Sequence, residues 1–128
     1  MEMHPIAHPE TMVTAIRIGS PVSWKKALKA VYGSKGLLES ITDREIFQAQ
    51  STLARLEGMF IEPFSATSTA GVKKLAEIGL IEQDEQVVCI ATGHGLKDPD
   101  IIIWNYKLQK VNLERKTNES IISAYAIM

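Results

Sequence analysis

Helix-like segments alternate with short apolar runs between Pro21 and Ile90, and this alternation constrains the fold more than any other feature. Helices between strands are the usual crossover connections of a parallel sheet. Residues 87–90 are apolar at four consecutive positions, as expected for a strand that is buried on both faces. The sequence therefore predicts an α/β fold, with three α/β/α layers around a small, mainly parallel sheet.

Three helices and three strands make up this prediction. The second helix has the clearest signal, because Thr42 and Glu45 have the spacing of a capping box and Gly58 follows as a stop. The other predicted elements are a helix capped by Ser23 and ended by Gly33 and Gly36, a helix over residues 65–78 ended by Gly79, and strands over residues 37–41, 59–62 and 86–91. Residues 14–19 are compatible with either a strand or a tightly packed segment, and residues 101–104 with either a strand or a helix.

Charge and cysteine content exclude several classes of protein. The 14 Lys and Arg residues balance 15 Asp and Glu residues, which argues against a nucleic-acid partner. The single cysteine, Cys89, is expected to be a small core residue, and no Cys/His cluster indicates a metal site. No apolar run approaches the roughly 20 residues of a membrane span, and residues 1–5 do not resemble a signal peptide. We expect a soluble cytoplasmic protein with no membrane partner.

Ligands of open parallel sheets bind beyond the carboxyl ends of the strands, and two stretches have this position. The first, residues 62–68, leads from a predicted strand into a helix N-terminus, where free N–H groups suit an anion such as phosphate. The hydroxyl groups of Ser65 and Thr67 also suit helix capping, which we weight at about two to one over ligand contact.

The second stretch, residues 91–99, follows the apolar strand and contains two glycines around a histidine. Thr92, at the end of that strand, is expected to point its hydroxyl group into the crevice. Gly93 and Gly95 allow the backbone to approach a ligand closely. His94 is a candidate base, ligand contact or surface loop residue, at about even odds for the structural role. The sequence lacks the nucleophile elbow, the Walker loop and the Gly-x-Gly-x-x-Gly motif, so no catalytic residue is assigned.

Taken together, these motifs resemble the C-terminal portion of threonine synthase, a pyridoxal-phosphate enzyme of the tryptophan-synthase-β type. The similarity runs in order from about residue 5 to residue 100. The blocks that carry it are residues 9–11, 14–21, 42–46, 53–58, 62–66 and 92–99. The resemblance implies a domain over residues 1–100, similar to part of the C-terminal region of the type II pyridoxal-phosphate fold. It also implies a divergent tail over residues 101–128 that packs on this domain or on another copy.

The family is a lyase of threonine biosynthesis that converts O-phospho-L-homoserine and water to L-threonine and phosphate. By resemblance, Thr92 is a hydroxyl partner of the pyridine nitrogen of pyridoxal phosphate, with the backbone of Gly93 beside it. The backbone around Ala15 and Ile16 is expected near the cofactor ring. Glu62 and Ser65 are expected close to the cofactor.

The sequence also departs from the family. The family's cofactor-binding lysine lies in a Ser-x-Lys-type motif, whereas Ser34-Lys35 has the wrong spacing, and the Gly/Ser/Asn-rich phosphate loop is missing. Ser20 replaces the usual asparagine. Phe64 replaces a small residue, and its bulky ring would crowd a cofactor if it faced the crevice. We expect the isolated chain to be inactive and unable to bind the cofactor alone.

Three roles follow from this combination. In the first, a separate N-terminal catalytic polypeptide completes the cofactor site. In the second, the chain is a non-catalytic binding or assembly module derived from the same fold. In the third, it is a phosphate-binding or nucleotide-binding domain that uses the helix N-terminus at Phe64 and Ser65. We expect a homo-oligomer, because large exposed apolar patches are rare on monomers.

Overall fold

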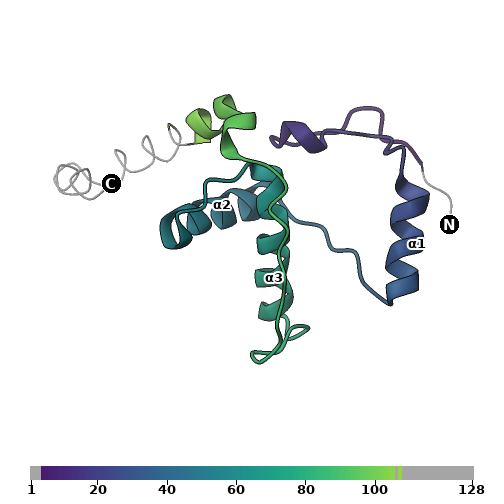
Figure 1. Ribbon diagram of the computed structural model, residues 1–128. Helices are drawn as coiled ribbons and strands as arrows, with labels where there is room; N and C mark the ends of the chain where they lie inside the picture. Colours follow the sequence, from purple (N-terminus) through teal and green to yellow (C-terminus); the bar gives the residue numbers. More distant parts are fainter. Residues whose placement is uncertain (1–3, 106, 108–128) are drawn as a thin grey trace. The chain divides into compact units, whose positions relative to one another are not determined.

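The computed structural model describes residues 4–105 and residue 107 (Figure 1). The chain divides into two compact units, residues 1–97 and residues 98–128. In the second unit, residues 99–105 and 107 are helical, and most of the predicted tail, including its apolar end at residues 121–128, lies outside the described residues. The elements of the first unit are η1 (Thr14–Ile16), α1 (Trp24–Ser34), α2 (Asp43–Glu57), η2 (Pro63–Ala66), α3 (Thr67–Glu77) and η3 (Gly95–Lys97), where η denotes a 3-10 helix. None of the helices in the described part is long and apolar enough to cross a membrane.

The predicted boundaries of α2 are confirmed, because local sequence fixes both ends of this helix. The backbone N–H of Glu45 donates to the Thr42 hydroxyl group over 3.3 Å, and the backbone N–H of Thr42 donates to the Glu45 carboxylate over 2.7 Å. This reciprocal pair satisfies N–H groups that a helix start otherwise leaves free. At the other end Gly58 adopts a left-handed conformation, with φ at 67°. Such a conformation costs glycine little.

The core lies where α2, η2 and α3 pack together (Figure 1). Ile46 on α2 is 1% exposed, and Ala66 at the end of η2 is fully buried. The buried apolar cluster consists of Val13, Ile46, Ala49, Ile61, Ala66 and Ala70. These small and branched side chains come from segments that lie far apart in the sequence, so the core holds distant parts of the first unit together.

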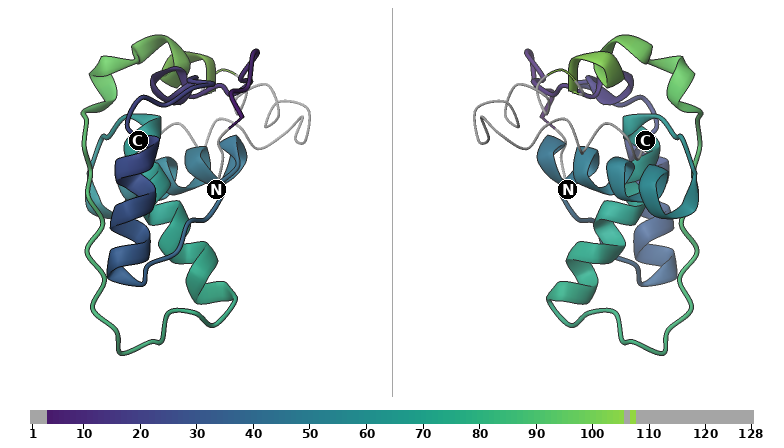
Figure 2. Two further views of the ribbon diagram at one scale, coloured as in Figure 1. Left: turned by 90° about the vertical axis from the view of Figure 1, so that its right-hand side faces the viewer. Right: turned by 90° about the vertical axis from the view of Figure 1, so that its left-hand side faces the viewer.

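The segment predicted as a buried strand at residues 86–91 is extended but exposed. In both views of Figure 2 the backbone that follows α3 first turns and then runs on as a single loop trace without a strand arrow. Val88 is 88% exposed and Ile90 is 71% exposed. The expectation that Cys89 is a core residue is wrong, because its side chain is exposed as well. A continuous apolar run indicates burial only when neighbouring strands cover it, and the described residues provide none.

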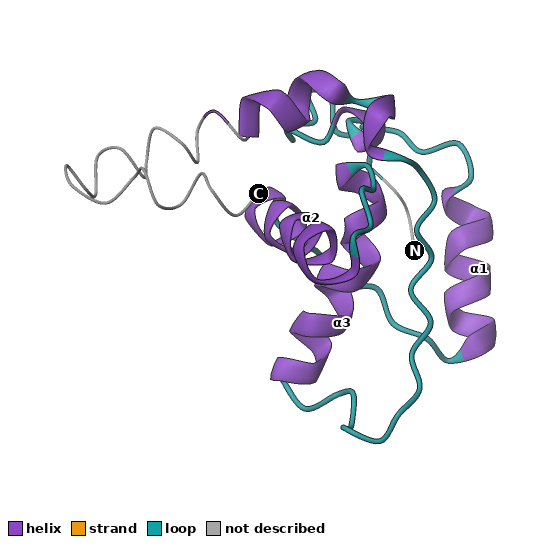
Figure 3. Cartoon of the chain, turned by 60° about the vertical axis from the view of Figure 1, so that its left-hand side comes forward, coloured by secondary structure: helices purple, strands orange, loops and turns teal. Residues whose placement is uncertain are grey.

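The predicted three-layer α/β/α fold with a parallel sheet is therefore wrong. Figure 3 shows helices and loops but no strand among the described residues. One isolated antiparallel bridge joins Ile61 to His94, and residues 37–41 form a loop instead of the predicted strand, with Leu37 and Leu38 exposed. Strands gain stability from pairing with neighbours, which sequence patterns within one segment do not reveal. The apolar runs were recognised, but their partners are not present in the described part of the chain.

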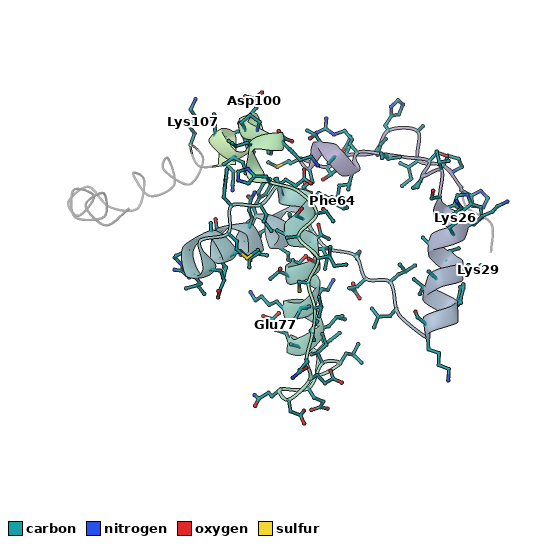
Figure 4. All side chains as sticks on the ribbon, viewed as in Figure 1. Lys26, Lys29, Phe64, Glu77, Asp100 and Lys107 are labelled. Atoms are coloured by element: carbon teal, nitrogen blue, oxygen red, sulfur yellow. The ribbon has the colours of Figure 1, made fainter. Side chains whose placement is uncertain are left out.

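Helix α1 begins as predicted, but its capping differs from the prediction. Ser23 is the N-cap residue, yet its side chain makes no capping hydrogen bond. Gly33 lies inside the helix, and Lys35 takes the left-handed position at its end with φ at 55°. None of the residues of α1 is buried. The lysines of this helix are exposed; Figure 4 labels Lys26 and Lys29.

Candidate functional site

The two stretches that the sequence singled out lie against each other in the structure. The backbone N–H of Glu62 donates to the carbonyl oxygen of Gly93, and that of Gly95 donates to the carbonyl oxygen of Phe60, each over 3.0 Å. The contact is an antiparallel bridge rather than the edge of a parallel sheet. It nevertheless places the start of η2 next to the turn that contains Thr92.

Ser65 is the centre of this contact. Its side chain is almost fully buried, and its hydroxyl oxygen accepts a hydrogen bond from the backbone N–H of Gly93 over 2.7 Å. The hydroxyl oxygens of Ser65 and Thr92 are 2.9 Å apart, within hydrogen-bond distance. Thr92 itself is exposed, so its hydroxyl group belongs to a residue that a ligand can reach.

The predicted capping role of Ser65 and Thr67 is wrong. The N-cap residue of α3 is Ala66, which has helical backbone angles and no capping side chain. Since η2 continues directly into α3, Ala66 and Thr67 at the junction both have helical backbone angles and not the extended conformation that a capping hydroxyl group needs. The Thr67 hydroxyl oxygen is buried and has no hydrogen-bond partner among the residues that the structure describes. The Ser65 hydroxyl group is therefore available for Gly93 and Thr92.

Glu62 places a buried carboxylate beneath the same turn. The residue is only 4% exposed, and its Oε1 atom lies 3.1 Å from the Nζ atom of Lys97. A Cβ atom at position 93 would lie 2.0 Å from this oxygen, which explains why a glycine occupies the position. The role of Lys97 was missed, since nothing local to the sequence indicates an ion pair between residues 35 positions apart.

His94 has a structural role in this turn. Its Nδ1 atom accepts a hydrogen bond from the backbone N–H of Leu96 over 3.2 Å. Its ring meets that of Phe60 edge-on, with 5.5 Å between the ring centroids. A Cβ atom at Gly95 would lie 2.5 Å from the Phe60 ring, so the second glycine is also required by close packing. Among the alternatives for His94, the geometry favours the loop residue.

Ala15 and Ile16 lie on η1 and are not part of the hydrogen-bonded group around Ser65. Residues 14–16 form a 3-10 helix, so the strand alternative for residues 14–19 is wrong, and the segment is not tightly packed either, because none of its residues is buried. Ile16 packs against the buried core, whereas Ala15 is exposed. The nearby chain is anchored by Asp43, whose carboxylate accepts from the Thr11 hydroxyl group and from the backbone N–H of Met12. No pattern in the sequence indicated this anchor.

Two further features bear on where a ligand can bind. An open depression of about 400 Å³ is lined by Pro9, Glu10, Thr11, Met12, Arg17 and Asp43. None of the predicted site residues lines this depression, so it is separate from the hydrogen-bonded group around Ser65.

The bulky Phe64 is 38% exposed on η2 (Figure 4).

Comparison with known proteins identifies the family. Residues 2–93 match the family of pyridoxal-phosphate dependent enzymes. A threonine synthase of Methanocaldococcus jannaschii is 61% identical over 99 residues, which are 77% of this chain and 24% of the relative. Threonine synthases of Methanosarcina acetivorans and Mycobacterium leprae are 58% and 52% identical, over 77% and 75% of this chain and 24% and 27% of their own lengths. The chain thus spans about a quarter of the length of these curated relatives, and the resemblance to threonine synthase is confirmed for this part. The chain belongs to the family of pyridoxal-phosphate dependent enzymes.

Proposed function

We propose that this chain is the part of a threonine synthase that binds the ring nitrogen of pyridoxal phosphate through Thr92. The whole enzyme would convert O-phospho-L-homoserine and water to L-threonine and phosphate, within threonine biosynthesis in the cytoplasm. The observation that carries the proposal is the exposed residue Thr92, whose hydroxyl group is held 2.9 Å from buried Ser65. It lies within the part of the chain that is similar to relatives named threonine synthase.

The donor groups of the site fit a ring nitrogen. When bound, pyridoxal phosphate supplies an electron sink for chemistry at the substrate's side chain. A carboxylate partner would favour a protonated ring, whereas a hydroxyl group leaves it neutral. The carboxylate of Glu62 is buried and paired with Lys97, whereas Thr92 is exposed and offers an uncharged hydroxyl group to a ring nitrogen.

The remaining predicted residues support Thr92 in this proposal. Gly93 contributes backbone next to the ring, and its N–H holds Ser65 in place. The Glu62 carboxylate packs against the backbone of Gly93 and so limits the positions that this turn can take. Ala15 and Ile16 approach the ring from η1 in the assembled enzyme.

The lysine that attaches the cofactor and the loop that binds its phosphate come from another polypeptide segment in this proposal. The Ser-x-Lys spacing occurs once in the 128 residues, at Ser23-Trp24-Lys25, where Ser23 is the N-cap residue of α1, and a Gly/Ser/Asn-rich loop is not present. The partner is therefore the remainder of the enzyme, supplied by a separate N-terminal polypeptide or by a longer form of the same chain. The 128 residues alone are expected to release no phosphate from O-phospho-L-homoserine.

A chimera tests the proposal. The matched 99 residues of the Methanocaldococcus jannaschii relative are replaced by their counterparts from this chain, and phosphate release is measured. We expect activity in the chimera, retention of activity with Thr92→Ser and a strong loss with Thr92→Val, which keeps the shape but removes the hydroxyl group. Equal activity of the valine and serine variants would refute the role of Thr92.

Exposed apolar side chains favour a second candidate, a non-catalytic assembly module. Val22 is 99% exposed, and Val88 is nearly as accessible. Such a module would form homo-oligomers and show no response to pyridoxal phosphate. Static light scattering distinguishes this candidate, since a monomer at all concentrations would exclude it.

A further inference from the structure

The hydroxyl group of Ser65 has more possible partners than it has hydrogen-bonding groups. A serine hydroxyl carries one hydrogen to donate and two lone pairs to accept. The N–H of Gly93 occupies one lone pair, at 2.7 Å. The single hydrogen then has three possible acceptors within the described residues: Thr92 Oγ1 at 2.9 Å, the Gly93 carbonyl oxygen at 3.4 Å and Glu62 Oε1 at 3.5 Å.

Distance favours Thr92 as the acceptor. A hydroxyl hydrogen bond normally spans about 2.5 to 3.0 Å between oxygens, and the other two acceptors lie beyond that range. The nearer carboxylate oxygen of Glu62 already accepts from Lys97 at 3.1 Å, so its negative charge is partly compensated. If the Ser65 hydroxyl group donates its hydrogen to Thr92, the Thr92 hydroxyl hydrogen has no acceptor among the described residues.

We propose that Ser65 is a positioning residue that donates to Thr92 and thereby makes the Thr92 hydroxyl group an outward donor. The site then selects ligand atoms that accept a hydrogen bond, such as an unprotonated aromatic nitrogen, and disfavours protonated ones. The identity of the ligand rests on the proposed function, but the direction of the two hydroxyl groups does not. Ser65 acts through Thr92 and needs no contact with the ligand.

The direction of each hydroxyl group can be measured in the 128-residue chain without ligand. In an equal mixture of H₂O and D₂O, a hydroxyl hydrogen held inside the protein exchanges slowly and splits the carbon-13 signal of its own Cβ atom. We expect a split Cβ signal for Ser65 and a single averaged signal for Thr92. The reverse pattern, two averaged signals or two split signals would each overturn the proposal.

Two variants separate this positioning role from a general effect on folding. Ser65→Ala should speed amide exchange at Gly93 by up to about tenfold, because it removes the acceptor of that N–H. Ser68→Ala is the matched control, since the one hydrogen of the Ser68 hydroxyl group has the carbonyl oxygens of Ser65, at 3.1 Å, and Ile90, at 3.4 Å, as its possible acceptors rather than this pair. Equal exchange at Gly93 in both variants would contradict the proposal. Because no cofactor is needed for this measurement, its failure is distinct from failure of the chimera to act as a threonine synthase.

Discussion

Two stretches of the first unit place their apolar residues in opposite environments. The region around α2, η2 and α3 buries Ile46, Ala66 and Ala70, with Ile46 at 1% exposure. The extended segment at residues 86–91 leaves its valines and isoleucine exposed. The two stretches differ in what packs against them. Helix α2 packs against η2 and α3, which follow it in the sequence, and both of its ends are capped by adjacent residues. The segment at residues 86–91 has no comparable neighbours in the described part of the chain.

The comparison also explains where the candidate site forms. Thr92 and Gly93 directly follow the exposed segment, yet they are held by contacts to Glu62 and Ser65 on the packed side. The contacts that hold Thr92 and Gly93 are thus made to the packed region and not to the exposed segment before them. Burial of the exposed segment would require a packing partner, and the described residues provide none.

The largest expected effect comes from removing a buried side chain on the packed side. Ile46→Ala should lower the free energy of unfolding by about 2–5 kcal/mol, since it removes buried methyl groups and leaves a cavity. Val88→Ala, the control on the exposed side, should change it by less than about 0.5 kcal/mol. Urea unfolding followed by circular dichroism provides both values. Similar losses for the two variants would remove the distinction between the regions.

A methyl group at Gly93 should cost about 1–3 kcal/mol of unfolding free energy, because the new Cβ atom overlaps the buried Glu62 carboxylate. Gly33→Ala is the matched control: nothing lies within 4 Å of the added carbon, and alanine favours the helix interior in which this position lies. The control should leave the urea midpoint unchanged or raise it. If Gly93→Ala behaved in the same way, the close packing of this turn would be disproved.

Loss of the α2 cap should have a smaller effect. Thr42→Ala removes the hydroxyl group that accepts from the N–H of Glu45 and should cost about 1 kcal/mol. Ser23→Ala at the start of α1 should cost a few tenths of a kcal/mol at most, because the Ser23 side chain makes no such bond. Thermal unfolding of the two variants measures the difference, and a larger loss for Ser23→Ala would contradict the assigned caps.

The smallest expected effect is the dependence of stability on pH. Hydrogen bonds from the Thr42 hydroxyl group and backbone lower the pKa of Glu45, and the hydrogen bond from Lys74 lowers the pKa of Glu39. A lowered carboxyl pKa stabilises the folded chain above the ordinary value of about 4.3, and this stabilisation is lost as the pH falls. Glu45→Gln keeps a capping-box residue that does not titrate, so its urea midpoint should fall less on acidification than that of the wild type. An unchanged acid dependence in this variant would exclude the contribution of Glu45.

The features that could be predicted from the sequence depend on neighbours along the chain. The capping box of Thr42 and Glu45 and the stop at Gly58 need only local backbone, and all three are confirmed. The prediction of a parallel sheet is wrong because the apolar run at residues 86–91 forms a strand only if other strands pair with it. Lys97 was missed because its partner Glu62 is distant in sequence, although both lie in blocks that were singled out.

The central claim is that the Thr92 hydroxyl group binds the ring nitrogen of the cofactor. The affinity of the chimera for 4-deoxypyridoxine 5′-phosphate, which keeps the ring nitrogen and lacks the aldehyde, tests it most directly. We expect binding to weaken by about tenfold in Thr92→Val and to remain near that of the parent chimera in Thr92→Ser. Equal affinity of all three proteins would contradict the claim.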